Sequence, residues 1–154
     1  MYDDTIAAVA TATGEGGIGI VRISGENALS ILEKVFCSVK NRPTENRKLT
    51  YGFVTDNFTG EKIDEVMAVY MKAPHSYTAE DVVEIQCHGS IVSLRKILAL
   101  VLKNGARLAE PGEFTKRAFL NGRLDLSQAE AVIDLVRAKS DKTFDVALSQ
   151  LEGS

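Results

Sequence analysis

The sequence changes character at Pro111, and this change limits the possible folds more than any other feature. Before Pro111, short β-branched runs bounded by Gly, Pro, Asn or Asp alternate with two runs of helical apolar periodicity. The expected strands cover residues 6–10, 18–24, 49–55, 66–71 and 82–87. After Pro111 the strand signals stop. The pattern therefore predicts a strand-and-helix region followed by a helical one.

The expected helices have recognisable boundaries. Residues 26–36 form the first, and residues 90–103 form a second that begins at a Ser90 N-cap and stops at Gly105. A Pro-Gly turn at 111–112 leads into another helix, and residues 125–152 contain no glycine or proline.

The long helix over 125–152, or a pair of helices broken near Ser140, is expected to need partners. Ser127 and Glu130 have capping-box spacing. Apolar or small residues step by three or four along one face: Ala129, Val132, Val136, Ser140, Phe144, Leu148 and Leu151. Such a stripe requires other helices to cover it. We therefore expect either a piece of a longer protein, or a tail that joins a bundle with another copy.

Charge and composition exclude several classes of protein. The net charge of −3 gives no general attraction to nucleic acid or anionic membranes, so a bound RNA would need a local site or residues elsewhere. The basic loop 38–48 could touch phosphate or be a solvated connection. No apolar run reaches the roughly 18 residues of a membrane span, and the acidic N-terminus is unlike a secretion signal. A cytoplasmic protein is expected.

Metal and thiol chemistry are not expected either. Cys37 and Cys87 are far apart, which favours reduced thiols over a disulfide or zinc site. His88 lies beside Cys87, but His75 is the one other histidine and no acidic cluster has ligand spacing. We expect no metal site and no catalytic nucleophile.

The stretch TGEGGIGIVRISGE contains a G-x-G-x-x-G pattern at Gly14, Gly16 and Gly19. In a dinucleotide-binding fold a helix opens at the last glycine. Here the β-branched run 18–24 follows, so no helix N-terminus would face a phosphate. These glycines are expected to allow a tight turn or a close backbone approach.

Four charged residues are candidates for binding. Arg22 and Glu84 each interrupt an apolar strand, where a charged group needs a partner. Arg22 could grip an anion or reach water from an edge strand. Glu84 could accept two adjacent N–H groups of a ligand such as a pterin, or form an ion pair, with Arg22 itself as one candidate partner. Arg117 and Arg123 are cations near the expected junction with the helical region, with solvated charge as the alternative.

Three segments resemble the N-terminal region of the MnmE (TrmE) family of tRNA-modification GTPases: TATGEGGIGIVRISG, SYTAEDVVEIQCHGS and RLAEPGEFTKRAFLNGRLDLSQAEAVIDLVRAKS. The resemblance implies an α+β fold whose mixed β-sheet and helices are related to the folate-binding domain of aminomethyltransferases. It implies a tetrahydrofolate-binding and dimerisation domain over 1–118 and the start of a helical domain over 119–154. Arg22, Glu84 and Arg123 fall on the family's folate contacts.

The resemblance also implies partners and cofactors. The family binds 5-formyl-tetrahydrofolate or a related reduced folate, forms homodimers, and works with the flavoprotein MnmG (GidA) on C5 of the wobble uridine of tRNA. A G domain uses GTP, Mg²⁺ and K⁺, but this sequence contains no G-x-x-x-x-G-K-[ST] pattern. GTP hydrolysis is therefore expected outside this segment, and no catalytic residue is expected within it.

Two other functions remain as alternatives. A free-standing folate-dependent aminomethyltransferase-like enzyme would need a catalytic aspartate, and no acidic residue has that character. A tRNA-binding adaptor is disfavoured by the acidic composition and by the lack of alternating aromatic and basic residues.

Overall fold

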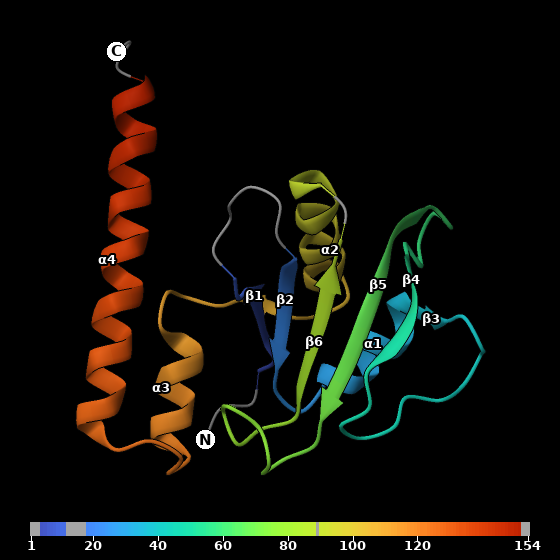
Figure 1. Ribbon diagram of the computed structural model, residues 1–154, viewed down its shortest axis with the longest axis horizontal. Coiled ribbons are helices and arrows are strands. Elements are labelled where there is room, and N and C mark those ends of the chain that lie inside the picture. The colour runs from blue at the N-terminus through green and yellow to red at the C-terminus, as the bar shows by residue number, and fades with distance from the viewer. Residues whose placement is uncertain (1–3, 12–17, 89, 152–154) are drawn as a thin grey trace. The chain divides into compact units, whose positions relative to one another are not determined.

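The computed structural model describes residues 4–11, 18–88 and 90–151, the last eleven of these by backbone alone (Figure 1). The chain divides into two compact units. The first comprises Met1–Ser76 and Glu80–Ala109, and the second comprises Tyr77–Ala79 and Glu110–Ser154. The functional domains expected at 1–118 and 119–154 remain a prediction, because compactness alone does not assign a function.

The described part of the first unit contains one seven-stranded sheet in the order β3-β4-β5-β6-β2-β1-β7. The strands are β1 (Ile6–Val9), β2 (Gly19–Ser24), β3 (Phe36–Ser38), β4 (Thr50–Thr55), β5 (Lys62–Met71), β6 (Val82–Cys87) and β7 (Arg107–Leu108). Neighbours are antiparallel except β1 and β7, which are parallel. The expected mixed sheet is confirmed.

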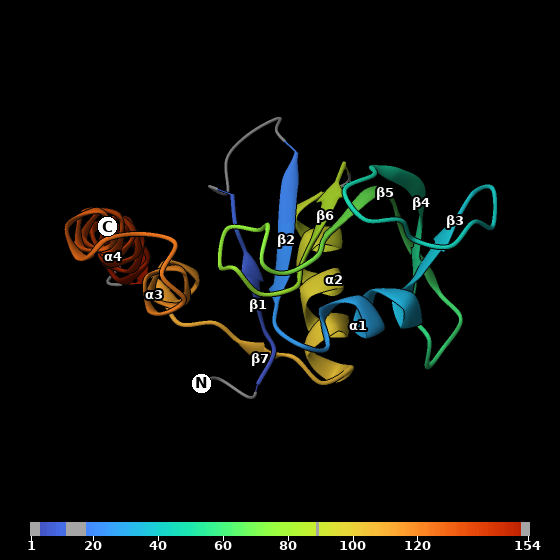
Figure 2. The ribbon, with the colours of Figure 1, turned by 90° about the horizontal axis from the view of Figure 1, so that it is seen from below.

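Two helices, α1 (Ala28–Val35) and α2 (Ile91–Lys103), pack on the same face of this sheet (Figures 1 and 2). Alternate strand residues meet the helices in one hydrophobic core, because successive side chains of a strand point to opposite faces. The core includes Val21, Ile23, Val66, Ala68, Val83, Ile85, Ile31, Leu32, Ile97 and Val101. The residues between them on β2 and β6, such as Ile20 and Gln86, are half-buried on the opposite face.

Local signals set the ends of α2 as expected. The Ser90 side chain accepts a hydrogen bond from the Ser93 backbone N–H, and Gly105 follows the helix with φ +117°. Gly19 lies in a strand, and a Cβ there would be 2.8 Å from Leu94 Cδ2 of α2. The expected close approach is thus confirmed at Gly19, whereas Gly14 and Gly16 lie outside the described residues.

Sequence patterns missed two short strands and misplaced some boundaries. The expected helix 26–36 is α1, which ends at Val35 because Phe36 begins β3 and pairs with Val54. β7 was not expected, because it has two residues, both exposed, which is too short for an alternating apolar pattern in the sequence. β5 begins at Lys62 rather than at 66, since the charged residues Lys62, Asp64 and Glu65 hide the apolar pattern of its first part.

The second unit contains α3 (Glu113–Leu120) and α4 (Leu126–Leu151), which pack against each other. Gly112 begins α3 with φ +81°, and a Cβ there would be 3.2 Å from Ile133 of α4. At the start of α4 the Asp125 and Gln128 side chains each accept a hydrogen bond from the other residue's backbone N–H, at 2.7 and 3.0 Å. The capping box expected at Ser127 and Glu130 is therefore wrong, because the helix begins two residues earlier.

The apolar stripe expected on α4 is confirmed at Ala129, Val132 and Val136 but not at Ser140, which is exposed. Ala129 is buried, and Val132 and Val136 are half-buried. Phe144, Leu148 and Leu151 belong to the same expected stripe, but their side chains lie outside the described residues. Among the described residues, none of the helices combines the length and apolar character needed to cross a membrane.

Candidate folate-binding site

Arg22 and Glu84 form an ion pair between two central strands of the first unit. They are register partners of β2 and β6, and Arg22 Nε donates to Glu84 Oε2 at 2.9 Å. Their side chains are 23% and 19% exposed. The structure thus joins two residues that are 62 positions apart in the sequence. The ion pair that sequence reasoning offered as one alternative for Glu84 is present.

The strand pattern explains why these charges leave the core. Val21 and Ile23 flank Arg22, Val83 and Ile85 flank Glu84, and all four apolar side chains point into the core beneath the helices. The charged side chains therefore point to the other face, where they keep partial contact with water. A carboxylate has about four lone-pair positions, so Glu84 can accept further N–H groups besides that of Arg22.

A second polar contact lies two residues further along β2, at Ser24. Ser24 is fully buried, and its hydroxyl donates to Glu80 Oε1 at 2.7 Å. The Glu80 backbone carbonyl in turn accepts a hydrogen bond from Ser76 Oγ. The loop before β6 is thus tied to β2, next to the Arg22–Glu84 pair. Sequence reasoning did not identify Ser24, because an isolated serine in an apolar strand carries no distinctive signal.

Arg123, the third expected folate contact, lies in the second unit. It follows Gly122, which has φ +80°, and its backbone N–H donates to the Ala118 carbonyl at 2.8 Å. The guanidinium carbon is 5.6 Å from the centroid of the Tyr77 ring, within cation–π range. The Tyr77 hydroxyl shares a 2.8 Å hydrogen bond with Thr115 Oγ1 of α3. Arg123 thus belongs to a local cluster of the second unit.

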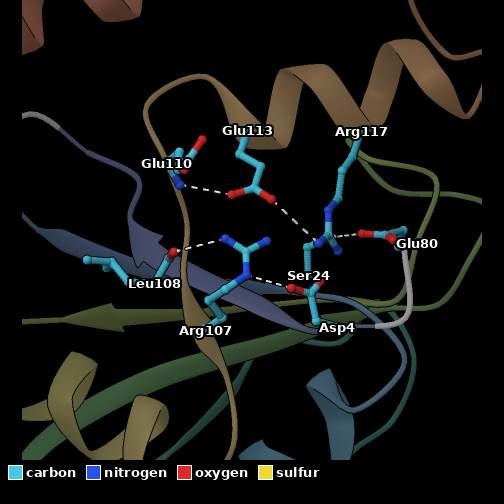
Figure 3. Close-up of polar contacts among 8 residues, drawn as sticks. All are labelled: Asp4, Ser24, Glu80, Arg107, Leu108, Glu110, Glu113 and Arg117. Atoms are coloured by element: carbon cyan, nitrogen blue, oxygen red, sulfur yellow. Dashed lines mark hydrogen bonds and ion pairs between the residues drawn. The ribbon is translucent and has the colours of Figure 1, made fainter. Parts of the chain in front are cut away.

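Arg117 is fully buried rather than solvated, and Figure 3 shows its guanidinium group facing the Glu113 carboxylate of the same helix. Its side chain has no exposed surface, and its Nη2 is 3.6 Å from Glu113 Oε2, one helical turn earlier. Glu113 Oε1 also accepts a 2.9 Å hydrogen bond from the Glu110 backbone N–H. The solvated alternative for Arg117 is therefore wrong. A buried pair of this kind is costly to break, because one charge would lose its partner.

The two cysteines occupy different environments. Cys37 is exposed in β3, and Cys87 is buried at the end of β6. Burial, with a smaller contribution from the Asp64 carboxylate, raises the pKa of the Cys87 thiol from 9.0 to about 12. That thiol stays protonated at neutral pH and is a poor nucleophile. Within the described residues, no three His, Cys, Asp or Glu side chains form a cluster able to hold a metal.

Comparison with known proteins identifies the family. The family model described as GTP-binding protein TrmE N-terminus matches residues 5–123. The chain is 62% identical over 157 residues to the tRNA modification GTPase MnmE of Alkaliphilus metalliredigens, and 61% identical over 157 residues to that of Clostridioides difficile. It is 59% identical over 154 residues to that of Geobacter sulfurreducens.

These alignments cover 99–100% of this chain but 34% of each of the three relatives. The chain therefore spans about a third of the length of the curated relatives it matches. The match extends over both compact units and includes Arg22, Glu84 and Arg123. The resemblance drawn from the three sequence segments is confirmed, and the chain belongs to the TrmE N-terminus family.

Proposed function

We propose that this chain is the folate-binding, homodimerising N-terminal module of a GTPase that modifies C5 of the wobble uridine in tRNA. The family match and the activity for which the relatives are named support the general role. GTP, Mg²⁺ and K⁺ would act in a G domain outside this chain, whose sequence has no P-loop pattern. The flavoprotein MnmG and tRNA would be partners of the complete protein.

The observation that supports folate binding is the half-buried Arg22–Glu84 pair. A reduced folate carries adjacent N–H donors on its pterin ring and carboxylates on its glutamate tail. The Glu84 carboxylate suits the first, because it accepts several N–H bonds, and a guanidinium suits planar or anionic acceptors. The pair is partly open to solvent, so a ligand can reach it without unfolding the sheet.

Arg123 is proposed as the third folate contact. Its guanidinium group is held near the Tyr77 ring by a cation–π contact. A guanidinium keeps its charge throughout the accessible pH range. The residues present therefore match the chemistry of a reduced folate: one carboxylate for N–H donors and two guanidinium groups for acceptors or anions.

Homodimerisation is proposed through the first unit. The sheet face opposite α1 and α2 carries half-buried apolar side chains, among them Ile20, Met67 and Val69. Such a surface is typical of a face that is covered by a partner. The assignment of residues 1–118 to folate binding and dimerisation, and of 119–154 to the helical domain, is part of the same proposal.

Calorimetric titration of the chain with 5-formyl-tetrahydrofolate and, separately, with GTP tests this function. We expect saturable folate binding and no GTP binding. Arg22→Lys should weaken folate binding, because lysine keeps the charge but loses the planar fork. Folate affinity unchanged in Arg22→Ala would remove Arg22 from the site, and GTP binding without folate binding would refute the proposal.

A further inference from the structure

A pocket of about 250 Å³ lies at the β3–β4 edge of the sheet, in the connection between the two strands. We call it the loop pocket. Its lining includes Val39, Lys40, Arg42, Leu49 and Tyr51. Pockets that enclose whole cofactors usually measure about 300–1,000 Å³. The loop pocket is smaller, which suits one residue of a polymer lying across the surface better than a complete cofactor.

The loop that forms this pocket is fixed at both ends. The Ser38 hydroxyl accepts a hydrogen bond from the Arg42 backbone N–H at 2.7 Å and donates to the Arg42 carbonyl at 3.2 Å. At the other end the Arg47 backbone N–H donates to the Tyr70 carbonyl at 2.7 Å, and Arg47 Nη1 donates to the His75 carbonyl. The loop is thus anchored by hydrogen bonds to β5 and to the loop after it, although most of its residues are exposed, as in the solvated connection that the sequence allowed.

The charge of this region is opposite to that of the whole chain. Residues 38–48 contain Lys40, Arg42, Arg47 and Lys48 against the single acid Glu45, although the chain carries a net charge of −3. Glu45 is paired with Lys48 at 3.2 Å. Among the described residues, no acidic side chain forms an ion pair with Lys40 or Arg42. Two cations at the pocket are therefore available to an anion.

Tyr51 supplies a flat wall beside these cations. Its hydroxyl donates to Glu65 Oε2 at 2.8 Å, and its ring meets Phe53 edge-on at a centroid distance of 5.9 Å. These contacts fix the ring, yet the residue is 43% exposed. Phe53 lies on the same face of β4, and Lys62 Nζ sits 4.0 Å from its centroid. Aromatic and basic groups from separate parts of the sequence thus lie close together in this region of the sheet.

We propose that the loop pocket is a contact site for single-stranded RNA, with Lys40 and Arg42 each on a phosphate and the Tyr51 ring against a base. Cations that follow a backbone and an exposed aromatic ring that stacks on a base are the two features of such sites. The choice of RNA as occupant rests on the proposed role in tRNA modification. The site lies on β4 and its loop and shares no residue with the Arg22–Glu84 pair, so the two can be tested separately.

The salt dependence of binding tests the phosphate contact. A short single-stranded RNA of mixed sequence is titrated into the chain at several salt concentrations, and log affinity is plotted against log salt. Removing both cations, Lys40→Ala with Arg42→Ala, should reduce the slope by about 1.4, at about 0.7 per lost phosphate contact. With equal affinities at 1 M salt, this corresponds to a loss of about 25-fold in affinity at 0.1 M.

The matched control removes two exposed cations from the helices, Lys34→Ala with Arg95→Ala. It changes the net charge equally but should leave the slope and affinity near those of the unmodified chain. An equal loss in both double variants would show general electrostatic attraction and overturn the site. RNA that fails to bind the unmodified chain at low salt would also overturn it.

Tyr51 separates a nucleotide site from a simple anion site. Tyr51→Ala should weaken RNA binding about tenfold without changing the salt slope, because stacking does not release counterions. Tyr51→Phe keeps the ring and should retain the affinity, although it loses the bond to Glu65. If Tyr51→Ala binds RNA normally, or if poly-glutamate displaces the RNA equally well, the pocket binds anions in general and the proposal fails.

Folate titration of the Lys40→Ala, Arg42→Ala variant keeps this proposal distinct from the proposed function. Folate affinity should be unchanged, because no folate contact has been removed. RNA binding lost with folate binding intact supports the loop pocket. Folate binding absent from every variant, with the RNA results as expected, would refute the folate assignment and leave the RNA site standing.

Discussion

Arg22 Nε and Glu84 Oε2 lie 2.9 Å apart between adjacent strands, so two of the proposed folate contacts are each other's ion-pair partner. A ligand that binds here must share Glu84 with Arg22. The arrangement fixes the orientation of both side chains before a ligand arrives, which lowers the entropy cost of binding.

Glu84→Gln is expected to reduce folate affinity more than stability. An amide offers one acceptor and an opposing NH₂, so each lost charge-assisted bond should cost about 1.5–3 kcal/mol of binding free energy. A partly exposed ion pair contributes about 0–1 kcal/mol to the free energy of unfolding. Calorimetry and chemical denaturation of the same preparation measure the two effects.

The control for this variant is Glu33→Gln, which changes the same chemical group at an exposed position of α1. It should alter neither folate affinity nor stability by more than experimental error. Should Glu84→Gln bind folate like the unmodified chain, or lose most of its stability, Glu84 would be a structural partner of Arg22 and nothing more.

Truncation after Gly122 is expected to leave the dimer intact and to weaken folate binding. The first unit keeps all seven strands and both of its helices, whereas Arg123 and α4 are removed. Losing one charge-assisted contact should cost about 1.5–3 kcal/mol of affinity. Light scattering and calorimetry give the two results.

Arg123→Ala in the full chain is the control for the truncation, because it removes the guanidinium and keeps α4. Both changes should lower folate affinity by the same amount. A monomer in light scattering for both the full and the shortened chain would refute dimerisation, and equal folate affinity in all three would exclude Arg123 from the site.

Gly19→Ala is expected to destabilise the first unit by about 1–3 kcal/mol, the usual cost of overpacking. The new methyl group would stand 2.8 and 2.9 Å from the two terminal carbons of the Leu94 side chain. The same substitution made in a Leu94→Ala background should cost much less, because the obstructing carbons are gone. Denaturant unfolding of the four proteins measures this coupling, and an equal cost in both backgrounds would contradict the contact.

The free energy of unfolding should fall as pH rises from 9 toward 12, in part because of Cys87. The pKa of the Cys87 thiol is about 12 in the folded chain and 9.0 in the unfolded chain. Above pH 9 the unfolded chain therefore loses this proton first, which stabilises the unfolded state relative to the folded one. Below pH 9 both states hold the proton and the effect vanishes.

Cys87→Val keeps a small apolar side chain and removes the titration. Its stability should therefore decline less steeply with pH between 9 and 12 than that of the unmodified chain, which subtracts the tyrosine and lysine contributions common to both. Parallel curves would show that the Cys87 thiol is not protected by the core.

Strong local patterns predicted most of the framework. The apolar residues at 82, 83, 85 and 87 predicted β6 with the observed ends, and the Ser90 cap with Gly105 predicted α2. β3 and β7 were not predicted, because their three and two residues form strands through pairing with Val54 and Ile6 rather than through their composition. A strand that short has no period to detect.

The site was predicted in part for a physical reason. A charge inside an apolar strand is conspicuous, so Arg22 and Glu84 could be chosen as residues in need of partners. Their mutual contact depends on β2 lying beside β6 in one register, which spacing alone does not define. The loop pocket was beyond reach, since its cations and Tyr51 are brought together by hydrogen bonds between Ser38 and Arg42.

The parallel pairing of β1 with β7 has a consequence for the order in which the protein acquires its structure. β1 is first in the chain, yet it lies between β2 and β7, and Ile6 pairs with Arg107 about a hundred residues later. Asp4 and Arg107 form an ion pair across the same junction. During synthesis β1 keeps an open edge until Arg107 and Leu108 have left the ribosome, and open edges invite pairing with other chains. Contacts between residues so far apart in the sequence also slow folding. The first unit is therefore most prone to aggregate in the interval before Arg107 and Leu108 pair with β1.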